Sequence, residues 1–164
     1  MKLTLSRTKI VLLILIVACI VGAAVLIGVT KRNYHLTTYK SQDMEPTIGV
    51  NETLIIDNRV ENIRRGDLVL FKYPADQKQR FIKRVVGLPG EVISIRERRV
   101  FVGQQLLEES YVDSKLNTYT RNMADLTIPP HKYFVLGDNR DHSNDSRMWG
   151  PLSAELIYGR VRFK

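Results

Sequence analysis

The chain opens with a long apolar segment, after which hydrophobic positions recur only in short runs. Residues 10–29 carry no charged side chain and are mostly aliphatic. At about 1.5 Å per residue, a helix over these residues is roughly 30 Å long, which is the thickness of the hydrocarbon core of a bilayer. We therefore predict one transmembrane helix near the N-terminus.

Two other interpretations explain this segment less well. A cleaved secretory signal has an apolar region of about 7–15 residues, which is shorter than the segment seen here. A lipoprotein signal is suggested by residues 16–19, which end at Cys19, but the apolar run continues to residue 29. The length therefore favours an uncleaved membrane anchor.

Basic residues flank the anchor unevenly. Lys2, Arg7 and Lys9 precede it, and Lys31 and Arg32 follow it. An excess of Lys and Arg marks the cytoplasmic side of a membrane helix. Together with the N-terminal amine, this bias predicts a single-pass protein of the cell membrane, with its N-terminus in the cytoplasm and its C-terminal part outside it.

From residue 52 onward the pattern is that of β-strands, because short apolar or alternating runs are separated by turn residues. The runs are residues 54–56, 68–71, 81–86, 92–95, 100–102, 133–136 and 157–161. We predict a mainly β fold, a folded antiparallel sheet or small barrel, preceded by one transmembrane helix.

The predicted organisation has two parts. Residues 1–30 form the cytoplasmic tip and the transmembrane anchor, and residues 31–164 form the extracytoplasmic β domain. We expect residues 31–38 to link the two parts. Residues 104–130 are polar and irregular, which predicts a long surface excursion.

Composition and charge narrow the possible partners. The formal net charge of +8 favours contact with anionic membrane lipid. The chain has no dense basic tract with interleaved aromatic residues, which argues against nucleic-acid binding. Cys19 is the only cysteine, so an intrachain disulfide is excluded, and the three histidines are scattered. Because no cluster has metal-ligand spacing, we predict no metal and no cofactor.

Four segments form a specific pattern when they are taken together and in order. They are residues 41–47 (SQDMEPT), 66–71 (GDLVLF), 83–90 (KRVVGLPG) and 137–150 (GDNRDHSNDSRMWG). Behind an N-terminal anchor, this arrangement resembles the type I signal peptidases, and the resemblance spans the chain. That family consists of membrane serine proteases with a Ser–Lys dyad and a mostly β fold, which remove signal peptides from exported proteins.

The resemblance implies roles for most of the candidate site. Lys83 matches the general-base lysine, and Arg84 matches its usual neighbour. Ser143 matches the serine that orients this lysine. Asp145 and Arg147 match an acidic–basic pair that supports the site, as Asp138 is also expected to do.

The nucleophile position departs from the family, because it holds Asp43 instead of serine. Ser41 falls where some members supply an oxyanion donor. Acyl transfer needs an oxygen that a nearby base can deprotonate, and a carboxylate has no such proton. A carboxylate close to Lys83 also stabilises the ammonium form, so we expect an ion pair between the two. An aspartic-protease mechanism would need a second carboxyl beside Asp43, and the family pattern places none there.

Two functions remain open for a family member of this kind. The first is a catalytically impaired homologue that binds exported preproteins or pilus subunits as an accessory or chaperone factor, similar to signal-peptidase-like proteins of Gram-positive pilus loci. The alternative is an active signal peptidase in which Ser41, two residues from Asp43, replaces the nucleophile; this would need a shift of about 6–7 Å along the strand. A self-cleaving repressor with a similar dyad is disfavoured by the membrane segment and by the lack of a DNA-binding helix pair.

Overall fold

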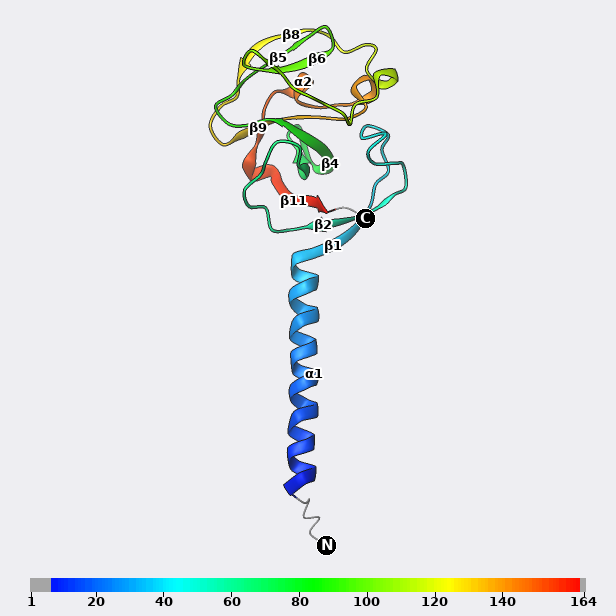
Figure 1. The fold of residues 1–164 in the computed structure, drawn as a ribbon, viewed down its shortest axis with the longest axis vertical. Coiled ribbons are helices and arrows are strands. Elements are labelled where there is room, and N and C mark those ends of the chain that lie inside the picture. Colours follow the sequence, from blue (N-terminus) through cyan, green and yellow to red (C-terminus); the bar gives the residue numbers. More distant parts are fainter. Residues whose placement is uncertain (1–6, 163–164) are drawn as a thin grey trace.

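The computed structural model describes residues 7–162, and it consists of one long helix joined to a β domain (Figure 1). Helix α1 spans Arg7–Asn33 and projects away from the domain as a single rod. Within it, Thr8–Val29 is long and apolar enough to cross a membrane, and none of this stretch is buried inside the protein. The predicted helix is therefore confirmed and extends past the apolar segment at both ends.

Strand β1, Tyr34–Thr38, follows the helix without a spacer, so the expectation of a linker over residues 31–38 was wrong. β1 pairs along its whole length with β2, Thr53–Asp57, in antiparallel register. The Asn58 N–H also donates to the Asn33 carbonyl at 2.7 Å. The strand is short and partly polar, so its pairing with β2, and not its own pattern, makes it β structure.

A seven-stranded antiparallel sheet forms the half of the domain next to the helix. Its strand order is β1-β2-β11-β3-β4-β9-β10. The strands after β2 are β3 (Leu68–Tyr73), β4 (Asp76–Gly87), β9 (Lys132–Leu136), β10 (Leu152–Ser153) and β11 (Ile157–Arg162). Successive β3 residues enter different hydrophobic clusters, Leu68 and Leu70 in one and Val69 and Phe71 in another. Both faces of this sheet are therefore covered.

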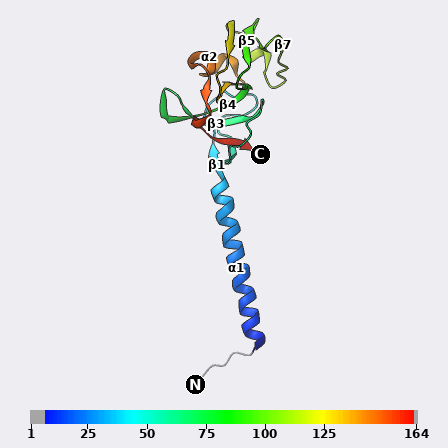
Figure 2. The same cartoon turned by 90° about the vertical axis from the view of Figure 1, so that its left-hand side faces the viewer.

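A smaller sheet lies at the end of the domain far from the helix (Figure 2). Its order is β7-β6-β5-β8, with β5 (Val92–Arg96), β6 (Arg99–Val102), β7 (Gln105–Leu106) and β8 (Met123–Thr127). Residues 104–130 were expected to be a surface excursion, but they supply two of these four strands. Phe134 and Leu136 pack with Ile93 and Ile95, which joins the two sheets through one buried cluster.

All seven predicted apolar runs lie within strands of the structure, so the mainly β antiparallel fold is confirmed. Four short helical turns complete the described chain: η1 (Ser114–Leu116), η2 (Arg140–His142), α2 (Ser146–Trp149) and η3 (Ala154–Leu156). The pairing of β4 with β9 places the segment that holds Lys83 beside the segment that begins at Gly137.

Candidate active site

Lys83 and Asp43 meet at the centre of the candidate site. Lys83 lies on β4, and its side chain is fully buried, whereas Asp43 lies in the loop between β1 and β2 with 14% of its side chain exposed. The ammonium donates to Oδ2 of Asp43, which is its only hydrogen-bond acceptor among the described residues. The expected ion pair is therefore confirmed.

The second oxygen of the Asp43 carboxylate is also engaged. The Tyr39 hydroxyl donates to Oδ1 of Asp43. Burial raises the pKa of the Tyr39 phenol far above its ordinary value, and the adjacent carboxylate raises it further, so the phenol keeps its proton and remains a donor. Sequence analysis missed this tyrosine, because nothing in the local pattern marks a residue that donates to a carboxylate.

The loop that carries Asp43 is held against the turn after β9. The Asn139 N–H donates to the Asp43 carbonyl at 3.2 Å, and the Asn139 amide donates to the Gln42 carbonyl at 3.1 Å. Gly137 lies between the two segments. A Cβ there would lie 2.5 Å from the Asp43 carbonyl oxygen and would overlap Oγ of Ser143. The position therefore requires glycine because of close approach.

Neither serine of the predicted site forms a hydrogen bond with Lys83 in the described structure. Oγ of Ser143 is buried and has no hydrogen-bond partner among the described residues, so the orienting contact implied by the resemblance is not formed. Ser41 is exposed, and its hydroxyl accepts from the Asp43 N–H at 3.4 Å. The physical reason is the carboxylate, which takes the ammonium that either hydroxyl would otherwise meet.

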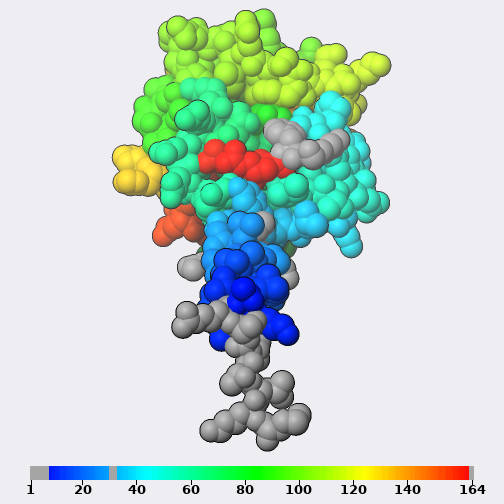
Figure 3. All heavy atoms as spheres, turned by 60° about the horizontal axis from the view of Figure 1, so that its bottom comes forward, coloured from blue at the N-terminus to red at the C-terminus, as the bar shows by residue number. Residues whose placement is uncertain are grey.

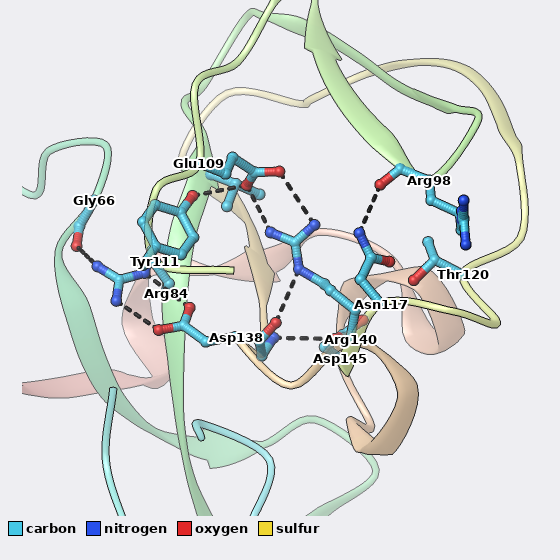
Figure 4. Close-up of polar contacts among 12 residues, drawn as sticks. Gly66, Arg84, Arg98, Glu109, Tyr111, Asn117, Thr120, Asp138, Arg140 and Asp145 are labelled. Carbon is cyan, nitrogen blue, oxygen red and sulfur yellow. Dashed lines mark hydrogen bonds and ion pairs between the residues drawn. The ribbon is translucent and has the colours of Figure 1, made fainter. Parts of the chain in front are cut away.

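Arg84 and Asp138 form a buried bidentate ion pair next to this centre (Figure 4). The guanidinium donates to both carboxylate oxygens, at 2.8 and 2.6 Å, and to the Gly66 carbonyl at 3.0 Å. The Thr47 hydroxyl donates to Asp138 at 2.5 Å. Because Asp138 is committed to these partners, it does not form a carboxyl pair with Asp43.

Asp145 and Arg147 are paired as well, at 2.8 and 2.7 Å. The fully buried Asp145 also accepts from the Gly137 N–H at 3.1 Å, and it caps helix α2 by accepting from the Arg147 N–H. This carboxylate therefore holds the turn that supports the Asp43 loop.

A fourth ion pair of the site, also buried, escaped the sequence analysis. Arg140 donates to the Glu109 carboxylate at 3.2 and 2.6 Å, and its Nε donates to the Gly137 carbonyl at 3.0 Å. The Tyr111 hydroxyl also donates to Glu109, while the Tyr111 ring lies 3.9 Å from the Arg84 guanidinium (Figure 4). Glu109 and Tyr111 belong to a stretch that looked like polar surface, so no local signal pointed to them.

A pocket of about 370 Å³ opens beside Asp43. The end of β1 and the residues after it form one wall, and Leu70, Phe81 and Ile82 contribute apolar surface. Among the described residues, the backbone groups of Lys40 and Ser41 make no hydrogen bond, although both residues line the pocket. The pocket thus combines apolar lining with an unpaired stretch of backbone, which suits an extended peptide.

Within residues 7–162, no group of three or more His, Cys, Asp or Glu side chains is placed to hold a metal ion. The polar groups of the site are instead arranged in ion pairs, two of which join β4 to the surrounding loops and one of which joins Arg140 to Glu109.

Comparison with known proteins gives a consistent result. The family model described as "Signal peptidase, peptidase S26" matches residues 7–164. A probable signal peptidase I-2 from Synechocystis sp. is 36% identical over 134 residues, which cover 75% of this chain and 60% of that protein. Signal peptidase IB from Staphylococcus aureus is 31% identical over 145 residues, with 77% and 75% covered.

A solved structure agrees with these relatives. The crystal structure of a signal peptidase I from Enterococcus faecalis is similar with a TM-score of 0.55 and 32% identity, over 63% of this chain and 99% of that one. A signal peptidase I from Leptolyngbya laminosa is 38% identical over 135 residues. The chain spans 60–65% of the length of the relatives from Synechocystis sp. and Leptolyngbya laminosa.

Proposed function

Because this chain belongs to the signal peptidase family, peptidase S26, we propose that it serves protein export as a membrane-anchored homologue that binds preproteins without cleaving them. One observation supports this proposal above all others: the buried ion pair between Lys83 and Asp43. It joins Lys83, which matches the general base of the family, to the side chain that stands at the expected nucleophile position.

The chemistry follows from the charges of this pair. A lysine acts as a general base only as a neutral amine, and a contacting carboxylate favours the ammonium. Asp43 has no hydroxyl to form an ester, and its two oxygens already accept from Lys83 and Tyr39. Loss of a triad-type nucleophile lowers turnover by about 10⁶. We therefore expect no measurable peptide cleavage by the native chain.

Binding does not need the dyad. The pocket beside Asp43 keeps an apolar lining, and the backbone of Lys40 and Ser41 is free to pair with an added strand. An extended segment of an exported preprotein, or of a pilus subunit, would add at this edge and place side chains in the pocket. The proposed role is that of an accessory or chaperone factor.

The proposed location follows from the anchor. α1 would cross the membrane once, with the N-terminus in the cytoplasm and the β domain outside it, as the excess of basic residues before the span indicates. The direct connection of α1 to β1 would hold the pocket close to the membrane, where an emerging preprotein is available.

Ser41 offers no support for the alternative of an active peptidase. Its hydroxyl is exposed and bonds only weakly to the Asp43 N–H, at 3.4 Å. Within the described residues, Lys83 donates to Asp43 and not to Ser41. The structure therefore gives Ser41 no base in direct hydrogen-bond contact to take its proton.

The deciding experiment compares cleavage of a signal-peptide substrate by the native chain, Asp43→Ser and Asp43→Ala. We expect no product from the native chain or from Asp43→Ala, and cleavage by Asp43→Ser that is lost again in Asp43→Ser/Lys83→Met. Cleavage by the native chain that disappears in Ser41→Ala would overturn the proposal in favour of an active enzyme.

Binding needs its own test with a cross-linkable peptide of signal-peptide sequence and the full-length native chain. We expect labelling within the pocket, and loss of labelling when Ser41→Trp fills the pocket. Ser114→Trp is the matched control, because Ser114 is exposed in the turn η1 and does not line the pocket. Equal labelling of both variants would refute binding at this site.

A further inference from the structure

A basic pocket of about 320 Å³ lies on the face of the domain from which the helix emerges. Figure 3 views the molecule from its helix end and shows β11 at the surface of this face. The charged residues that line the pocket are Arg59, Arg64, Arg160, Arg162, Asp57 and Glu61. The four arginines exceed the two carboxylates, which leaves 4 − 2 = +2 charges.

The contact of Arg59 with Tyr34, the residue that follows the helix, indicates where the pocket would lie relative to a bilayer. The apolar span ends at Val29, and Tyr34 lies five residues later, a rise of about 7.5 Å along the chain axis. The Arg59 guanidinium lies 5.0 Å from the Tyr34 ring centroid and donates to its hydroxyl. The headgroup region extends roughly 5–7 Å beyond the hydrocarbon core on each side. A helix that crosses the bilayer with Val29 at the edge of the hydrocarbon core would therefore place Arg59 near the outer edge of the headgroup region.

A buried carboxylate organises two of the arginines. Asp57 is 1% exposed and accepts from Arg59 at 3.0 Å and from Arg162 at 3.2 Å. The hydrogen bond from Arg59 lowers the pKa of Asp57 to about 2, so this anchor stays charged at neutral pH. Roughly half of each of these two arginine side chains remains exposed. Their unused N–H groups thus face solvent in a fixed arrangement.

Arg64 is the arginine of the pocket that has no ion-pair partner among the described residues. Its side chain is exposed and forms no ion pair with any described residue. Arg160, in contrast, is paired with Asp67 at 3.3 Å and donates to the Glu61 carbonyl. The pocket therefore presents one free guanidinium beside two that are only partly neutralised.

We propose that this pocket binds the phosphate of an anionic phospholipid headgroup in the leaflet that faces the β domain. Guanidinium groups match phosphate oxygens in bidentate geometry, and a set of them at headgroup depth meets lipid phosphate at high local density. A soluble phosphate would offer the same chemistry but not this position. The site is independent of Asp43 and of the peptide pocket, and it fixes how the domain sits on the membrane.

The test uses the full chain reconstituted in nanodiscs of phosphatidylcholine with spin-labelled phosphatidylglycerol or phosphatidylcholine. The native chain should associate preferentially with phosphatidylglycerol. Arg64→Gln should lower this preference about fivefold, the effect of one arginine near a membrane surface, and Arg64→Gln/Arg162→Gln should lower it further. Arg64→Gln removes no ion pair from the described structure, so its thermal unfolding should match that of the native chain.

The matched control is Arg98→Gln, which removes the same charge from the exposed β5–β6 turn at the far end of the domain. It should leave the preference unchanged. An unchanged preference in Arg64→Gln, or an equal loss in Arg98→Gln, would overturn the proposal. Displacement of phosphatidylglycerol by inorganic phosphate at constant ionic strength would overturn the lipid assignment and identify a site for soluble phosphate.

Discussion

Replacing Asp43 should destabilise the domain more than replacing Lys83, although each change breaks the same ion pair. Asp43→Ala leaves a fully buried ammonium without its acceptor, and removal of one partner from a buried pair costs about 3–5 kcal/mol. Lys83→Met leaves a carboxylate that is 14% exposed and still accepts from Tyr39. We expect that change to cost about 1–3 kcal/mol.

The double variant Asp43→Ala/Lys83→Met isolates the interaction energy between the two side chains from the energy of their other contacts. It contains neither charge, so its loss of stability should fall several kcal/mol short of the sum of the single losses. The exposed pair Arg96–Asp125, at 3.7 Å with about half of each side chain exposed, is the matched control. Its coupling should be below about 1 kcal/mol, because solvent screens it.

Urea unfolding of the full-length chain in micelles measures these energies. Trp149 is the only tryptophan, and its ring centroid lies 5.9 Å from that of Phe71 in the β domain, so its fluorescence reports unfolding of the domain and not of the anchor. Single losses that add to within about 0.5 kcal/mol of the double variant would show that the pair is not coupled. A larger cost for Lys83→Met than for Asp43→Ala would refute the burial argument.

Three further results are expected. The pKa of Asp57 is lowered from 3.8 to about 2, so the stability that this carboxylate contributes is present above pH 4 and is lost as the pH falls through 2. Because Arg59 is half exposed and screened by solvent, this contribution is limited to about 1 kcal/mol. Acid unfolding of Asp57→Asn should lack this loss of stability between about pH 4 and 2. Gly137→Ala should lower stability by about 1–3 kcal/mol, measured by thermal unfolding, because its Cβ would overlap buried atoms; an unchanged melting temperature would contradict this close approach. Glu109→Gln should cost about 3 kcal/mol by leaving the buried Arg140 charge uncompensated, and a cost below 1 kcal/mol in urea unfolding would contradict that reasoning.

The parts of the fold that were predicted correctly have local signals. The anchor follows from an unbroken apolar run, and the seven predicted strands follow from short apolar segments between turn residues. β1, β7, β8 and β10 were missed because they are short and partly polar. Such strands become β structure through the register of their partners, which no window along the chain contains.

The site residues also fall into those that the sequence predicted and those that only the structure revealed. Residue types and order along the chain identified Lys83, Asp43 and the acidic–basic residues of the 137–150 segment. Charge alone predicted that Lys83 and Asp43 would pair, given that the family pattern brought them together. Tyr39 and the Glu109–Arg140 pair could not be predicted, because each contact joins residues that no motif or hydrophobic pattern in the sequence singles out.

The sequence by itself determined the apolar helix, the β class and the residue types of the four segments that resemble the family, since hydrophobic length, alternation and residue type are properties of the chain. Only the tertiary structure decided that Lys83 pairs with Asp43 and not with Ser143, and that Arg59 contacts Tyr34 at the start of β1. The reason is distance along the chain: Asp43 and Lys83 are 40 residues apart, and packing of strands and loops chooses which charged groups share a buried space.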